Sequence, residues 1–211
     1  MRQGRLITLE GGEGAGKSTQ ARRLASWIAG TYDVDVVVTR EPGGAPGAEA
    51  IRELVVAGAT DRWDPGTEVL LHVAARREHV LRTICPALAE GRWVISDRFS
   101  DSTRAYQGVV QGAGLEFVDD ISRLAIGSMV RPDLTFLLDL PVGMGLARAE
   151  IRGTTNRYER MGEAFHERLR AAFLTIASNE TDRIKVVDAS GSEDDVARRL
   201  GSEVSRRWPI P

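Results

Sequence analysis

The 211-residue sequence predicts a single domain, residues 1–211, with a three-layer α/β fold in which helices cover both faces of a parallel five-stranded sheet. Two observations support this prediction. Short apolar runs rich in β-branched residues alternate with longer segments of helical periodicity, which is typical of parallel sheets with helical crossovers. The length suits one well-packed α/β domain, and no repeat, linker or low-complexity segment divides the chain.

Each predicted element follows from its local pattern. The strands are apolar runs bounded by breakers or charges: a run beginning at residue 6, then 34–40, 93–97, 134–140 and 184–188. We expect the β-branched run 34–40 to be a buried strand. The helices have apolar residues at three- and four-residue spacing: 18–29, 48–56, 67–90, a segment after Asp101, 116–129, 142–151, 163–179 and 192–208.

A glycine-rich turn joins the first strand to the first helix with the spacing Gly11-x-x-x-x-Gly16-Lys17-Ser18, the P-loop pattern. Its glycines let backbone N–H groups surround a phosphate, and the helix adds the positive end of its dipole there. Lys17 can reach β- and γ-phosphates, and the Ser18 hydroxyl can bind Mg²⁺. The pattern predicts a nucleoside-triphosphate site formed by Gly11, Gly12, Glu13, Gly14, Ala15, Gly16, Lys17, Ser18 and Thr19.

Other polar residues follow the predicted strands where ligands bind in parallel sheets, at the carboxyl edge. Arg40-Glu41-Pro42-Gly43 follows the second strand, Asp97-Arg98 ends the third, and Asp139 lies near the end of the fourth. Asp97 is suited to the Mg²⁺ shell, and Arg98 to an acceptor phosphate. An ordinary surface ion pair is the alternative interpretation of Asp97 and Arg98.

A basic segment at about 148–162 completes the pattern of a small kinase, which needs a mobile flap over the transferring phosphoryl group. It contains Arg148, Arg152, Arg157 and Arg160, with Gly153 and Gly162 as hinges. An ordinary solvated helix end is the alternative. A GTPase is excluded because Asn-Lys-x-Asp cannot occur with lysine only at positions 17 and 185. A motor or AAA-type ATPase would be larger, with a hydrophobic-Asp-Glu motif in place of Ser-Asp-Arg.

Composition narrows the setting of the protein. The 28 Lys and Arg residues nearly balance the 30 Asp and Glu residues along the chain, so we expect neither a nucleic-acid nor a membrane partner. Cys85 is the single cysteine and is expected to be a core residue, which fits a reducing cytoplasm. We find no signal region or membrane-spanning run.

The motifs together resemble the thymidylate kinase family over essentially the whole chain. The matching segments are Leu9-Glu10-Gly11 through Thr19, Thr39-Arg40-Glu41-Pro42-Gly43-Gly44, Glu68-Val69-Leu70-Leu71 with Ala74-Ala75-Arg76, Asp97-Arg98, Ser102 through Gly108, and Arg131 through Thr135. The resemblance implies transfer of the γ-phosphoryl of Mg-ATP to dTMP, giving dTDP and ADP for dTTP synthesis and DNA replication. It also implies a homodimer formed through helices.

The resemblance also implies roles for individual residues. The catalytic set would be Glu13, Lys17, Arg98, Arg152 and Arg157, Arg148 would join the ATP site, and Ser18 and Asp97 would hold Mg²⁺. The dTMP site would comprise Glu13, Pro42, Arg52, His72, Arg76, Arg98, Thr103, Tyr106 and Gln107. Within it, Arg98 and Arg52 would bind the phosphate, Arg76 and Thr103 the base, and Tyr106 would exclude a 2′-hydroxyl. A cis bond is expected before Pro42.

Two positions depart from the family pattern. His72 replaces the phenylalanine that stacks on thymine; a neutral imidazole can also stack, and the alternative is a rotated helix that uses Leu71 or Val73. Glu150 stands in the basic segment where relatives often have arginine. Two other functions remain open at this stage: a different small-molecule kinase, and a non-catalytic ATP-binding module.

Overall fold

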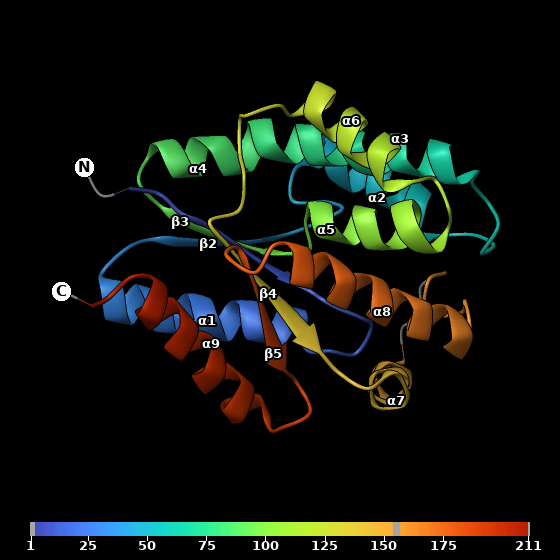
Figure 1. The fold of residues 1–211 in the computed structure, drawn as a ribbon. Coiled ribbons are helices and arrows are strands. Elements are labelled where there is room, and N and C mark those ends of the chain that lie inside the picture. Colours follow the sequence, from blue (N-terminus) through green and yellow to red (C-terminus); the bar gives the residue numbers. More distant parts are fainter. Residues whose placement is uncertain (1–2, 154–156, 211) are drawn as a thin grey trace.

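The computed structural model describes residues 3–153 and 157–210 and confirms the predicted three-layer α/β fold (Figure 1). Its strands pair in parallel in the order β2-β3-β1-β4-β5. They are β1 (Leu6–Glu10), β2 (Val36–Arg40), β3 (Trp93–Asp97), β4 (Leu134–Asp139) and β5 (Ile184–Asp188). β1 is the central strand of the sheet and is buried along its whole length. Because of this central position, the carboxyl end of β1 lies at the middle of one edge of the sheet.

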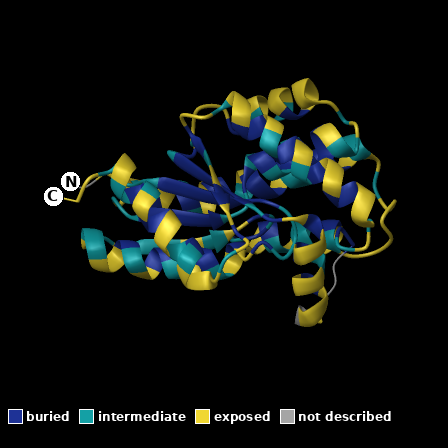
Figure 2. Ribbon diagram, turned by 60° about the horizontal axis from the view of Figure 1, so that its bottom comes forward, coloured by how far each residue is buried: buried dark blue, intermediate teal, exposed yellow. Residues whose placement is uncertain are grey.

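Helices cover both faces of the sheet (Figure 1). On one face, α1 (Lys17–Tyr32) and α9 (Glu193–Arg207) pack on Ile7 and Leu9 of β1. The adjacent residue Leu6 points to the other face, as alternation along a strand requires, and packs with the π-helical turn η1 (Val80–Ile84) and α4 (Cys85–Ala89). Figure 2 shows the buried sheet enclosed by helices whose outer faces are exposed.

The remaining helices complete the fold, and several of them contribute residues to the main pocket. They are α2 (Pro46–Val56), α3 (Pro65–His79), α5 (Ser100–Thr103), the π-helical segment η2 (Arg104–Val110), α6 (Leu115–Ala125), α7 (Val142–Arg152) and α8 (Glu163–Asn179). In the described residues, no helix is both long enough and apolar enough to pass through a membrane.

One local prediction was wrong. The run 34–40 is not a buried strand: β2 lies at the edge of the sheet, and Val38 is 43% exposed. A β-branched run fits an edge strand as well as a central one, because pleated backbone favours these residues in both. The predicted helical stretch 67–90 is confirmed: α3, η1 and α4 follow one another without a break, and the middle segment is π-helical. Pro86 has no N–H to donate to the preceding turn, and the wider η1 turn lies just before α4.

Candidate active site

The turn after β1 forms a phosphate-sized cradle because its glycines adopt conformations that other residues rarely take. Gly14 and Gly16 have φ of +68° and +86°, and Gly16 caps the start of α1. A Cβ atom on Gly14 would lie 2.0 Å from the carbonyl oxygen of Gly145 in α7. The absence of a side chain at Gly14 therefore lets the loop pack directly on α7.

Lys17 lies folded against this loop. Its ammonium group donates to the carbonyl oxygens of Gly11 at 3.1 Å and Gly12 at 2.6 Å, and the side chain is buried. Burial and the nearby Arg98 lower the pKa of Lys17 to about 8. Ser18 follows at the first turn of α1, and its hydroxyl donates to the Asp97 carboxylate at the end of β3. The third strand thus contributes an acidic oxygen directly beside the loop.

Glu13 connects the loop to the neighbouring residues. Its Oε1 accepts from Arg98 Nη2 at 2.8 Å and from the Tyr106 hydroxyl at 2.9 Å. Burial would raise the pKa of Glu13, but Arg98, Lys17 and the Tyr106 hydroxyl outweigh this effect and lower the pKa to about 2. The Arg98 guanidinium also lies 5.1 Å from the centre of the Tyr106 ring. Glu13 is therefore an ionised partner of both side chains.

A second cluster surrounds Arg76 on α3. Its guanidinium donates to Glu41 Oε2 at 2.7 Å, to the Phe99 carbonyl oxygen at 3.1 Å and to the Thr103 hydroxyl at 2.8 Å. Its third nitrogen, Nη1, is buried and has no hydrogen-bond partner within residues 3–153 and 157–210. Glu41 is held in turn by His79, which is buried and bonds to Thr39. Arg76 is thus fixed in place with one donor left for a ligand.

Beside this cluster, the Glu41–Pro42 peptide bond is cis, as expected from the sequence. The Pro42 carbonyl oxygen accepts from Arg52 Nη1 at 2.8 Å.

His72, one helical turn before Arg76, belongs to a network centred on Glu68. His72 Nε2 lies 3.0 Å from the Tyr158 hydroxyl, which donates to Glu68 Oε1 at 2.6 Å. The same oxygen accepts from Gln107 Nε2 at 2.7 Å. Burial and then the charges of nearby arginines, Arg76 first, lower the pKa of His72 to about 3. His72 is therefore neutral at physiological pH.

One pocket of about 550 Å³ unites these groups. The predicted site residues that line it are Glu13, Gly14, Gly16, Lys17, Ser18, Thr19, Pro42, Arg52, His72, Arg76, Asp97, Arg98, Thr103, Tyr106 and Gln107. Gly11 and Gly12 line a separate small pocket beneath the loop. Ala15 is a buried residue of the loop itself. In the described residues, no cluster of three or more His, Cys, Asp or Glu side chains forms a metal site.

Arg157 does not lie where the sequence predicted. It is fully buried, its guanidinium pairs with Glu68, and it donates to the carbonyl oxygens of Val55 and Thr60. A buried carboxylate requires a counter-charge, and Arg157 supplies it, so the guanidinium is not directed at the P-loop.

Arg148 and Asp139 also differ from the prediction in their placement. Arg148 is exposed and donates to the Ala189 carbonyl oxygen after β5, outside the main pocket. The side chain of Arg152 lies outside the described residues. Asp139, expected at the crevice, forms an ion pair with Arg170.

Sequence reasoning missed Glu10, Glu68 and Tyr158 as residues that support the site. A signal for Glu68 was present in the sequence. Glu68 lies four and eight positions before the predicted base-binding residues His72 and Arg76, so all three share one helical face. A carboxylate on a buried helical face needs hydrogen-bond donors or a positive charge beside it, so Glu68 could have been expected to anchor a polar network. Nothing local marks Tyr158, since its contact with Glu68 joins residues 90 positions apart.

A glycine loop with its lysine, a serine–aspartate pair and an arginine-lined cavity in one pocket define a P-loop phosphotransferase with an adjoining acceptor site. Comparison with known proteins identifies the type. A sequence model of the family described as "Thymidylate kinase" matches residues 9–200. The chain therefore belongs to the thymidylate kinase family, and it transfers a phosphoryl group from ATP to dTMP.

Individual relatives agree with this assignment. A thymidylate kinase from Caulobacter vibrioides is 54% identical, covering 98% of this chain and 99% of the relative. One from Dinoroseobacter shibae is 52% identical, with coverages of 92% and 93%. The crystal structure of thymidylate kinase from Ehrlichia chaffeensis has a TM-score of 0.76 at 33% identity, covering 96% of this chain and 99% of that one.

Proposed function

We propose that the pocket binds ATP at the loop end and dTMP at the Arg76 end, with the two phosphate chains meeting near Arg98. The observation that supports this division is the double contact of Glu13: a residue of the P-loop itself accepts from both Arg98 and Tyr106. The donor loop and the acceptor residues therefore share one rigid unit. Catalysis then rests on positioning and on charge neutralisation, because the acceptor phosphate is already an anion.

Each charged group has a distinct role in this proposal. Lys17 exchanges its two carbonyl partners for β- and γ-phosphate oxygens. Arg98, with Arg52, holds the dTMP phosphate, and its planar fork suits two oxygens at once. Arg152 is proposed to meet the transferring phosphoryl group, since it ends α7, the helix that packs on the P-loop at Gly14. Arg148 lies one turn earlier and is proposed to join the ATP site.

We propose that Ser18 and Asp97 hold Mg²⁺. A hydroxyl and a carboxylate are hard oxygen donors, and Mg²⁺ typically takes only one or two protein ligands together with substrate phosphates. The pair fits this requirement because the two oxygens are already in contact. Bound there, the ion would neutralise phosphate charge.

The base site is assigned to Arg76, Thr103, His72 and Gln107. Arg76 has an unpartnered Nη1 for a base oxygen, and Thr103 lies beside it. Turnover with a panel of monophosphates (dTMP, dUMP, UMP, CMP, dCMP, AMP and GMP) tests the site as a whole by measuring ADP release. We expect strong turnover with dTMP and weaker turnover with dUMP. Preference for another base would contradict these four assignments.

Tyr106 is proposed to close the sugar pocket against a 2′-hydroxyl. Replacing Tyr106 with alanine is expected to lower the preference for dUMP over UMP by about tenfold, because the space filled by the ring becomes available. The ratio of the two kcat/KM values measures this preference and is insensitive to partial unfolding of a variant that loses ring contacts with Tyr158 and Phe173. Tyr106→Phe is the matched control and should keep the preference. An unchanged ratio in Tyr106→Ala would place the ring elsewhere.

His72 is proposed to stack on the base as a neutral ring. Replacing His72 with phenylalanine should leave KM for dTMP within about threefold, since stacking is retained and Tyr158 keeps its bond to Glu68. Because the pKa of His72 is lowered to about 3, it carries no charge above pH 5. Profiles of kcat/KM between pH 5.5 and 9 should therefore coincide for the two enzymes. A loss above tenfold, or a shifted acid limb, would assign the imidazole a polar role.

We also propose a cytoplasmic homodimer. Exposed apolar side chains lie on the adjoining helices α3 and α6: Leu70 is 49% exposed, Phe117 38% and Leu124 79%. Apolar groups gathered on neighbouring helices are typical of a surface that a second chain covers. The mass in sedimentation velocity tests this proposal, and a monomer at micromolar concentration would contradict it.

A further inference from the structure

Arg98 has a backbone conformation that its side chain disfavours. Its φ is +72°, in the left-handed region. Among the described residues, Asp33 is the other non-glycine residue with positive φ, and it lies at the C-terminus of α1, where left-handed caps are common. Arg98 terminates no helix, so surrounding contacts must hold it in this conformation.

Glu10, at the end of β1, supplies two of these contacts. Its carboxylate is buried; Oε1 accepts from the Phe99 N–H at 2.8 Å, and Oε2 accepts from the Ser102 hydroxyl at 2.5 Å. The Ser102 oxygen in turn accepts from Arg98 Nη1 at 3.1 Å. One carboxylate thus fixes the backbone that follows Arg98 and, through one hydroxyl, the guanidinium itself.

Backbone contacts restrain the same turn from its other side. The Arg98 N–H donates to the Leu9 carbonyl oxygen at 2.9 Å, and the Ser96 hydroxyl donates to the Arg98 carbonyl oxygen at 2.8 Å. The left-handed residue is therefore held by β1 at its N–H and by β3 at its carbonyl oxygen.

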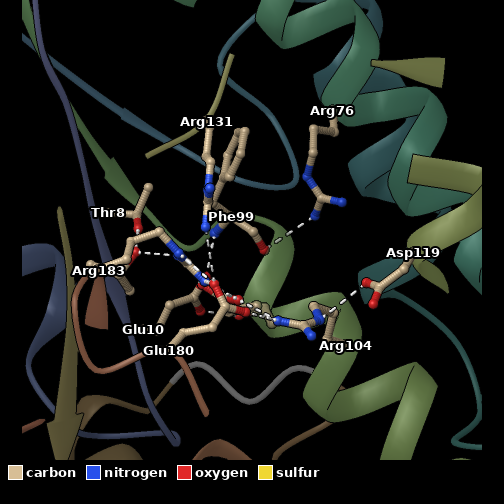
Figure 3. A network of polar contacts seen from close by, with 12 residues as sticks. Thr8, Glu10, Arg76, Phe99, Arg104, Asp119, Arg131, Glu180 and Arg183 are labelled. Atoms are coloured by element: carbon tan, nitrogen blue, oxygen red, sulfur yellow. Dashed lines mark hydrogen bonds and ion pairs between the residues drawn. The ribbon is translucent and has the colours of Figure 1, made fainter. Parts of the chain in front are cut away.

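The first turn of the short helix α5 is also anchored, at Asp101. Arg183 donates to Asp101 at 2.7 and 3.0 Å and to the Thr135 hydroxyl of β4 at 2.7 Å (Figure 3). Figure 3 shows Glu10 and Phe99 beside this network. Burial and the neighbouring Asp101 raise the pKa of Glu10 to about 7. A buried carboxyl group with a raised pKa opposes stability, and such groups cluster at functional sites.

We propose that Glu10 is a positioning residue for the acceptor phosphate: together with Ser102 it holds Arg98 in its left-handed conformation with the guanidinium directed into the pocket. This inference rests on the proposed role of Arg98. It goes further because it assigns a function to a buried carboxylate that is not among the described residues lining the pocket.

A double-mutant cycle between Ser102→Ala and Arg98→Ala tests the proposal. In the otherwise unchanged enzyme, Ser102→Ala should lower kcat/KM for dTMP by about tenfold while KM for ATP stays within twofold, because a small displacement of Arg98 is costly to phosphoryl transfer. In the Arg98→Ala background the same change should have an effect below twofold, since nothing remains to be positioned. Ser178→Ala, at an exposed hydroxyl on α8, is the control.

Different results would refute the positioning role of Glu10 and the proposed role of Arg98 in binding the acceptor phosphate. Equal losses from Ser102→Ala in both backgrounds, or no loss in either, would overturn the positioning role. An Arg98→Ala enzyme with unchanged KM for dTMP would instead refute the assignment of Arg98. Glu10→Gln is a second test. The amide oxygen of the new side chain can still accept from the Phe99 N–H, but its NH₂ group cannot accept from the Ser102 hydroxyl. This variant should reproduce the loss and the non-additivity of Ser102→Ala, and additive losses would count against the proposal.

Discussion

Replacing Lys17 with methionine is expected to lower kcat by about two to three orders of magnitude, the range found when one pre-organised charge at a developing anion is removed. Methionine preserves the length of the side chain but cannot donate to phosphate oxygens. The side chain lies against Gly11 and Gly12, so its loss should change the chemistry far more than the fold. Steady-state ADP release at saturating dTMP measures the effect.

The chain offers a natural control for this experiment. Lys185 is the other lysine, and its ammonium group donates to the Thr181 carbonyl oxygen at an exposed position. Lys185→Met should retain full activity. A Lys17→Met enzyme with kcat within tenfold of the unchanged protein would show that Lys17 binds no transferring phosphate.

Replacing Arg98 with alanine is expected to lower kcat/KM for dTMP by about three orders of magnitude, with KM for ATP within about threefold. The guanidinium is the charge that joins Glu13 to the proposed acceptor phosphate site. Arg98→Lys keeps the charge but loses the two-pronged geometry, so we expect an intermediate loss. Initial rates over a grid of both substrates separate the two KM values.

The left-handed backbone of Arg98 requires its own control. Arg98→Gly removes the same side chain but tolerates φ of +72°, so a difference between the glycine and alanine variants isolates backbone strain from the loss of charge. Arg82→Ala, at an exposed arginine paired with Glu78, controls for the change in net charge. Equal increases in KM for dTMP and ATP would place Arg98 between the substrates rather than on the acceptor.

Local residue patterns were sufficient to predict the phosphate-binding loop and the edge of the sheet at which the site lies. Gly14, Gly16 and Lys17 act through backbone conformation and close spacing along the chain, so their arrangement is largely local. Asp97 and Arg98 could be placed because parallel strands end at a common edge. Local patterns did not separate an edge strand from a central one, since β1 and β2 are both mainly apolar runs that end in a charged residue.

Contacts between residues far apart in the sequence determined the other features of the site. Arg157 was expected to act on the phosphoryl group, and the tertiary structure places it against Glu68 instead, because a carboxylate buried by helix packing requires a nearby positive charge. The contacts of Glu10 with Phe99 and Ser102 span about 90 positions in sequence. The sequence alone thus determined the fold class, the nucleotide loop and the kind of chemistry. Which charged side chains line the pocket and which pair with one another was decided only by the tertiary structure, because desolvation and partner geometry exist only once the chain is packed.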